Sequence, residues 1–205
     1  MTNLEQLIAR GRPAIVTMEV QRGVVGDLAA IRPLADVVEQ CGLIPNTAAL
    51  LAAARRRGVP VVHCRAVFRR DRAGSFRNVP MVNRLLENPE HVLEGSPQAE
   101  LVPEFGPEET DLDSPRYHGM SPFYGTNLDP MLRSAGASTL IATGVSLNVG
   151  ILGLVIEGIN RGYHIVLPTD CVTGYPPEYG RDVLANSLAR ITTQTTSREI
   201  LDAWA

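Results

Sequence analysis

The 205-residue sequence contains no lysine, and all 19 of its basic residues are arginine. Apolar residues make up 44% of the chain, yet no apolar run reaches the roughly 18 residues that a membrane span needs. A basic tract interleaved with aromatic residues is also missing, and the formal net charge is −3. We therefore expect a soluble protein whose main partner is not nucleic acid and that does not insert into a membrane.

Cysteine is scarce: Cys41, Cys64 and Cys171 are odd in number and lack the close spacing of metal-binding cysteines. The opening segment MTNLEQLIARGRP has no continuous apolar core, so it does not have the pattern of a signal peptide. Both features are typical of a protein of the reducing cytoplasm, and a cytoplasmic localisation is expected.

Short β-rich runs alternate with helical segments along the whole chain. This pattern predicts an α/β fold in three layers, α/β/α, with a mainly parallel central sheet of about six strands, similar to a Rossmann fold. No internal repeat or interdomain linker interrupts the pattern. A single domain over residues 1–205 is therefore expected.

The expected elements follow from the apolar runs and their flanking turn residues. Strands are predicted at 14–20, 60–65, within 111–116, 139–145, 164–168 and within 192–196. Residues 66–109 are predicted to be a long loop with one or two short helices. Helices are predicted from a Thr2/Glu5 capping box to about Gly11, at 45–57 with Asn46 near its start and Gly58 as its stop, at 126–136 with Thr126 as N-cap, at 148–161 before Gly162, at 177–190, and from 197 to the end.

Polar residues follow the predicted strands. In a parallel sheet, ligands bind outside the carboxyl ends of the strands. Residues scattered along the chain should therefore converge there: Glu19 and Gln21, Arg65, Arg116, the turn Ser146–Gly150, and Asp170.

Four stretches resemble one known family in their combination and order: AIVTMEVQRGVV, VPVVHCR, SPFYGTNLDPMLRSAGASTLIATGVSLNVG and GYHIVLPTDCV. The sequence is similar to the isochorismatase-like hydrolases, also called cysteine hydrolases. The resemblance covers nearly the whole chain and implies their fold, a homo-oligomer (dimer or tetramer), and a small-molecule substrate or ligand. It also implies a catalytic triad of Asp, Lys and Cys and a cis peptide bond at Val145–Ser146.

All three triad positions differ in this sequence. Glu19 takes the Asp position, and Gly150 takes the Cys position. Arg116 takes the Lys position if one extra residue is allowed, and otherwise Tyr117 takes it. The Asp and His residues that bind metal in the nicotinamidase branch have no counterpart in CRAVFRRD, so neither a metal nor another cofactor is expected.

These differences change the expected chemistry. An arginine side chain stays protonated at working pH, so Arg116 can orient or neutralise an anion but cannot accept a proton. Glycine at position 150 removes a covalent acyl-enzyme intermediate. True isochorismatases also carry glycine there and hydrolyse a vinyl ether with the carboxyl group as general acid. The resemblance implies that Glu19 could take that role.

The first hypothesis is a hydrolase of a small organic molecule, anions included, that forms no covalent cysteine intermediate. Glu19 would be the acid or base, and Arg116 would bind an anionic group. Gly150 would be part of a turn whose backbone amides bind an oxyanion or carboxylate. The remaining expected pocket residues are Gln21, Arg65, Tyr117, His118, Phe123, Val145, Ser146 and Asn148.

Two other functions stay open: a catalytically inactive member that binds a small molecule or a protein, and a C–N (amide) hydrolase that uses Cys64. Structural roles also compete at single positions. Glu19 could pair with Arg65 or Arg116 because a buried carboxylate needs a partner. Gly150 could serve close helix packing, and His118 could be a surface loop residue.

Overall fold

The computed structural model describes residues 4–9 and 13–205, so Thr2 and Gly11 of the predicted first helix lie outside the described residues. Over these ranges seven strands form one sheet, and every pairing in it is parallel. The order is β3-β2-β1-β4-β5-β7, and β6 adds to the end of β4. The strands are β1 (Pro13–Met18), β2 (Val61–Ala66), β3 (Leu112–Arg116), β4 (Thr139–Val145), β5 (His164–Pro168), β6 (Val172–Thr173) and β7 (Thr193–Thr195).

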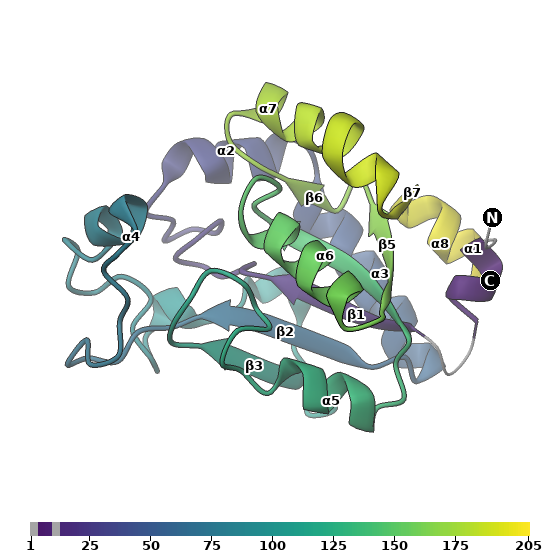
Figure 1. Cartoon of the computed structure of the whole chain (residues 1–205), viewed down its shortest axis with the longest axis horizontal. Coiled ribbons are helices and arrows are strands. Elements are labelled where there is room, and N and C mark those ends of the chain that lie inside the picture. Colours follow the sequence, from purple (N-terminus) through teal and green to yellow (C-terminus); the bar gives the residue numbers. More distant parts are fainter. Residues whose placement is uncertain (1–3, 10–12) are drawn as a thin grey trace.

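Helices cover both faces of the sheet (Figure 1). The α-helices of the described residues are α1 (Leu4–Leu7), α2 (Arg32–Gln40), α3 (Leu43–Arg57), α4 (Pro80–Leu85), α5 (Leu128–Ser134), α6 (Gly150–Asn160), α7 (Pro177–Asp182) and α8 (Ser197–Ala203). One apolar cluster joins α3 and α8 to one face, and a second joins α5 and α6 to the other. The predicted three-layer α/β/α class is confirmed.

The central strands form from mostly apolar and β-branched residues, with Thr17 in β1 and Thr139 and Thr143 in β4 as buried polar exceptions. Every residue of β1 and of β4 is buried, as expected for strands with helices on both faces. The two strands pair in register from Pro13↔Thr139 to Met18↔Gly144. A Cβ added to Gly144 would lie 2.2 Å from the Met18 carbonyl oxygen. Only glycine therefore allows these two strand ends to lie side by side.

Several predicted boundaries shift. Strand β1 ends at Met18 because Glu19 adopts a left-handed conformation, with φ 53°. Helix α3 begins at Leu43 after Gly42, and Asn46 does not cap it: its side-chain amide donates to the Asp170 carbonyl instead. Helix α6 begins at Gly150 rather than 148.

Other elements were not predicted or differ in detail. The sequence did not predict α2 or β6. Helix α5 begins two residues after Thr126, whose hydroxyl still accepts the Leu128 amide at 3.2 Å. The predicted 177–190 helix is α7 followed by a π-helical turn, Val183–Ser187, and a 3-10 turn, Leu188–Arg190.

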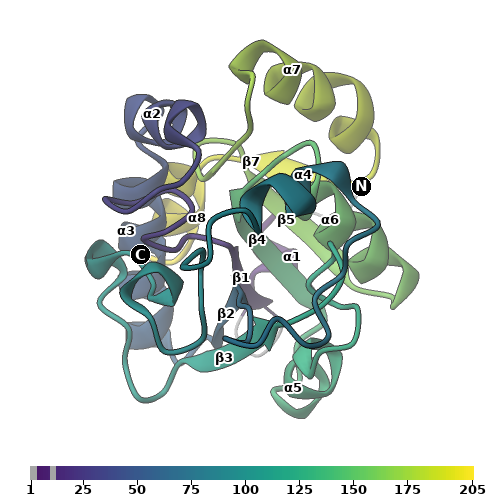
Figure 2. The same ribbon diagram turned by 90° about the vertical axis from the view of Figure 1, so that its left-hand side faces the viewer.

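The predicted long loop, 66–109, holds α4 and two 3-10 turns, Pro97–Ala99 and Pro103–Phe105. The loop lies over the carboxyl end of the sheet: Phe68 forms a bridge with Leu93, and Gln21 forms one with Leu101. Figure 2, which faces that side, shows α4 in front of the strands.

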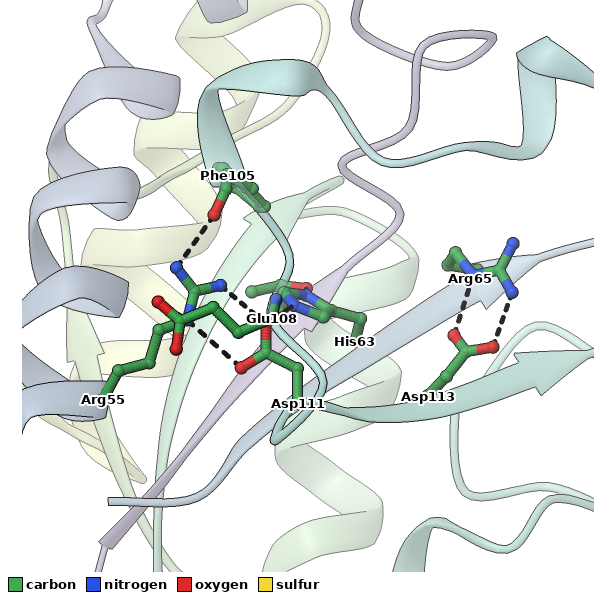
Figure 3. A network of polar contacts seen from close by, with 8 residues as sticks. Arg55, His63, Arg65, Phe105, Glu108, Asp111 and Asp113 are labelled. Atoms are coloured by element: carbon green, nitrogen blue, oxygen red, sulfur yellow. Dashed lines mark hydrogen bonds and ion pairs between the residues drawn. The ribbon is translucent and has the colours of Figure 1, made fainter. Parts of the chain in front are cut away.

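A polar network ties β1, β2 and Asp111, the residue before β3, to helix α3 (Figure 3). The Thr17 hydroxyl lies 2.8 Å from Nδ1 of His63, and Nε2 of His63 lies 3.2 Å from Asp111. The Arg55 guanidinium makes two hydrogen bonds to the Asp111 carboxylate, at 2.6 and 3.1 Å. These side chains are largely shielded from solvent and supply one another's hydrogen-bond partners. The network therefore stabilises the fold.

In the described part of the chain, no single helix is long and apolar enough to cross a membrane, although the bent pair α2 and α3 passes that test by length and composition.

Candidate functional site

A small cavity of about 110 Å³ lies at the carboxyl ends of β1, β2, β3 and β4. Its wall is mostly apolar, and its polar side chains among the described residues are Glu19, His91, Arg116 and Ser146. The apolar part of the wall is Val24, Ile31, Leu34, Ala66, Phe68, Phe76, Met81, Val82, Leu85, Met120 and Val145, beside Gly23. A mostly apolar hollow with a few polar groups is typical of a small-molecule site.

Glu19 enters this cavity directly from the end of β1. Its backbone amide donates to the Cys64 carbonyl at 2.8 Å, which fixes the residue in its left-handed conformation. Such a conformation costs a non-glycine residue on the order of 1–3 kcal/mol and is concentrated at functional sites. Among the described residues, Glu19 carries the one carboxyl group on the cavity wall.

Arg116 is the partner of Glu19. Its Nη2 donates to Oε1 of Glu19, and its Nε donates to the Gly119 carbonyl at 2.8 Å. The Arg116 side chain is 7% exposed and that of Glu19 is 20% exposed. The Nη1 atom of Arg116 is buried and has no hydrogen-bond partner in the described structure. A buried guanidinium N–H without a partner is rare, and it is suited to an anion or carbonyl oxygen of a ligand.

The turn after β4 provides Val145 and Ser146. The peptide bond between them is cis, as the resemblance implies. The Ser146 carbonyl accepts the amides of Val149 and Ile151, both at 3.0 Å, and so closes the turn into α6. Both residues line the cavity.

Gly150 lies behind this turn and does not line the cavity. A Cβ at this position would lie 2.8 Å from Cε of Met18 and 2.9 Å from the Val145 carbonyl oxygen. Gly150 is therefore closely packed against Met18 and the Val145 carbonyl, and its part in an amide site stays a prediction.

The remaining predicted residues lie outside the cavity wall. Gln21 is fully buried and satisfies the backbone at Ala66 and Ala99. Arg65 makes two hydrogen bonds to Asp113 (Figure 3). The Tyr117 hydroxyl donates to Glu94, and neither residue lines the cavity.

The other three are His118, Phe123 and Asn148. The Nδ1 atom of His118 lies 2.9 Å from the Gly74 carbonyl, and its ring packs edge-on against the cavity residue Phe76. Phe123 is buried against Tyr163 beneath α6. Asn148 has a buried Oδ1 without a hydrogen-bond partner in the described structure, but it does not line the cavity.

His91 is a site residue that sequence reasoning missed. It is 5% exposed, and its Nδ1 is buried without a partner in the described structure. Burial, and secondarily the positive charge of Arg72, lowers the pKa of His91 to about 4. The imidazole is therefore neutral at neutral pH. The nearest signal in the sequence was the apolar pair that follows it, Val92 and Leu93, inside a segment predicted to be a loop.

The thiols are poorly placed for catalysis. Cys64 and Cys171 are buried, and burial raises the pKa of each thiol to about 12. The third thiol, that of Cys41, is exposed, and none of the three lines the cavity. Within residues 4–9 and 13–205, no group of three or more His, Cys, Asp and Glu side chains could hold a metal ion.

The fold and the cavity define a three-layer α/β protein with a ligand site at the carboxyl edge of its parallel sheet. Residues 13–199 match the isochorismatase domain, and the chain belongs to the isochorismatase family of hydrolases.

Curated relatives lie in the same family. An uncharacterized isochorismatase family protein, YwoC of Bacillus subtilis (strain 168), is 31% identical over 51% of this chain and 54% of its own length. The ureidoacrylate amidohydrolase RutB of Methylobacterium radiotolerans is 32% identical over 70% of this chain and 60% of its own length. The chain thus spans between 54% and 60% of these two relatives.

Solved structures share the fold at low identity. A cysteine hydrolase from Pseudomonas syringae pv. phaseolicola 1448A has a TM-score of 0.80 and 22% identity, over 96% of this chain and 94% of that chain. The N-carbamoylsarcosine amidase from Thermoplasma acidophilum has a TM-score of 0.70 and 22% identity, over 91% and 96%. At these identities the likeness establishes the fold alone.

Proposed function

We propose that this chain hydrolyses a small organic molecule with Glu19 as the acid or base and without a covalent cysteine intermediate. The observation that carries the proposal is the Glu19–Arg116 pair on the cavity wall, with Nη1 of Arg116 left without a partner in the described structure. This arrangement supports the proposal because a carboxyl group, which could transfer a proton, lies beside a cation that could bind an oxygen of the substrate.

The roles follow from the contacts. Arg116 would hold an anionic or carbonyl oxygen through Nη1, and Ser146 would offer a hydroxyl from the same cavity wall. Water would attack the substrate carbon, the bond to the leaving group would break, and Glu19 would carry the proton between water and leaving group. No step needs a metal or another cofactor.

Replacing Glu19 tests this proposal. Glu19→Gln keeps the shape of the side chain but removes the group that transfers the proton, so kcat should fall by roughly 10²–10⁴. The assay is a panel of amides, carbamoyl compounds and vinyl ethers, and circular dichroism checks that the fold is retained. Glu100→Gln is the matched control, because this glutamate pairs with Arg22 outside the cavity. Unchanged turnover in Glu19→Gln would refute the assigned role.

The second candidate is a non-catalytic member that binds a small molecule through the same cavity. The ion pair favours it, because Arg116 already occupies the one cavity carboxylate among the described residues. Binding to the panel in a thermal-shift assay without turnover of any compound would favour this candidate.

Amide hydrolysis is a third candidate, since relatives of this chain are named amidohydrolase and amidase. A covalent route through Cys64 would require its thiol to leave the core, because it is buried and its pKa is raised to about 12. Covalent labelling of Cys64 by iodoacetamide with matching loss of activity would support that route.

A further inference from the structure

Two residues that line the cavity each carry a buried nitrogen atom without a hydrogen-bond partner in the described structure: Nη1 of Arg116 and Nδ1 of His91. They come from separate segments, since Arg116 ends β3 and His91 lies in the loop after α4. A buried polar atom without a partner costs on the order of 1–3 kcal/mol, so native proteins keep few of them. Two on one small cavity wall indicate a ligand that satisfies both.

We propose that His91 is a specificity-determining residue, which binds a second polar group of a compact ligand whose first polar group is held by Arg116. This inference rests on the proposed function in one respect, because it takes the same cavity as the ligand site. It adds the substrate class: a largely apolar molecule with two separate hydrogen-bonding groups.

The surroundings of His91 support this role. The ring packs 6.2 Å from the Phe68 ring, centroid to centroid, and both residues line the cavity. Because its pKa is lowered, the imidazole stays neutral and offers a hydrogen bond without a charge. A neutral nitrogen in an apolar wall discriminates strongly between a ligand that reaches it and one that leaves it unpaired.

The size of the cavity limits the occupant. Cavities of roughly 150 Å³ bind benzene, and this one measures about 110 Å³. It adjoins a groove between the start of α2 and α4, and Ile31, Met81 and Leu85 line both. A single ring that extends partly into this groove is therefore the largest suitable probe.

Benzoate, 3-hydroxybenzoate and 4-hydroxybenzoate provide the test, with affinities measured by calorimetry. In each probe the carboxylate is available to Arg116, and only the two hydroxybenzoates carry a second polar group. We expect at least one hydroxybenzoate to bind the wild-type protein about tenfold more tightly than benzoate. His91→Phe should abolish this preference and leave benzoate affinity within about twofold. His91→Gln, which keeps a hydrogen-bonding side chain, should retain part of it.

His118→Phe is the matched control, because this histidine lies near Phe76 but does not line the cavity. It should keep the hydroxyl preference. The proposal is overturned if none of the three probes binds, if all bind equally, or if the preference survives in His91→Phe. If His91→Phe does not fold, a crystal structure of the wild-type protein with the tighter hydroxybenzoate decides: a hydroxyl out of hydrogen-bond reach of His91 overturns the proposal.

A failure of the proposed function can be distinguished from a failure of the proposal for His91, because the affinity measurements report binding and not turnover. Glu19→Gln should lose turnover and keep the hydroxyl preference. Unchanged turnover in Glu19→Gln would reject the role of Glu19 and leave the result for His91 standing.

Discussion

Glu19 combines two features that oppose stability. It holds a left-handed backbone conformation, and it places a largely buried carboxylate against a cavity. The pairing with Arg116 offsets the cost of burying the carboxylate, but the buried Nη1 of Arg116 adds a cost of its own because it lacks a partner in the described structure. Local costs of this kind are kept where function requires them. The pairing itself is the structural role that the sequence analysis left open for Glu19, and its use as a ligand site is the proposal made above.

His91 should make stability depend on pH. Its folded-state pKa, about 4, lies below the ordinary histidine value of about 6.5. The unfolded chain therefore binds a proton more readily, and stability is lost as pH falls from about 6.5 towards 4. Burial also lowers the pKa of His63, which acts in the same direction.

Urea unfolding at several pH values checks this prediction. The free energy of unfolding should fall by on the order of 2–3 kcal/mol through His91 between pH 6.5 and 4. His91→Phe should reduce the slope over that range. Identical slopes in both proteins would show that His91 is not buried in its neutral form.

At the scale of elements, the junction of β4 and α6 is set by close packing. The strand ends at Val145, the turn closes through the Ser146 carbonyl, and the helix begins at Gly150 against Met18. The sequence predicted both the strand and the turn. It could not decide between a lost nucleophile and a packing glycine, because Met18 is distant in the chain and only the parallel pairing of β1 with β4 brings it there.

Two glycines of α6 allow a matched comparison. Gly150→Ala should lower the free energy of unfolding by about 1–3 kcal/mol, because its Cβ would press on Met18 and on the Val145 carbonyl. Gly153→Ala should instead raise it by up to about 1 kcal/mol, since its Cβ has no neighbour closer than 3.4 Å and alanine favours a helix. Chemical denaturation measures both. Equal effects would contradict the packing explanation for Gly150.

The segment 66–109 shows where element prediction fails. Long loops in compact domains often carry function, and this one supplies cavity residues such as Phe68, Phe76 and His91. Which side chains turn inward depends on the bridge between Phe68 and Leu93 and on the position of α4. Neither leaves a periodic pattern in the sequence, so His91 could not be selected in advance.

At the scale of the whole molecule, the two ends of the described chain lie together. The indole of Trp204 donates to the Ile8 carbonyl at 3.1 Å, and Arg57 of α3 donates to the Trp204 carbonyl. Trp204 is 6% exposed and belongs to the same apolar cluster as α3, α8 and one face of the sheet. This single tryptophan of the sequence should therefore report on the main core.

If residues 1–205 fold as one domain, unfolding should be cooperative. Tryptophan fluorescence and far-ultraviolet circular dichroism should then give coincident transitions in urea. Two separated midpoints would contradict a single cooperative domain and would place α8 in a unit of its own.

The sequence by itself determined the α/β class, the parallel sheet and the positions of Glu19 and Arg116 at strand ends. These depend on local apolar patterns and on the rule that parallel strands share one carboxyl edge. Only the tertiary structure decided that Glu19 pairs with Arg116 rather than Arg65, that Gly150 is packed against Met18, and that His91 joins the cavity. The physical reason is that such contacts join residues far apart in the chain, and the final packing of strands and loops selects one partner among several compatible with the sequence.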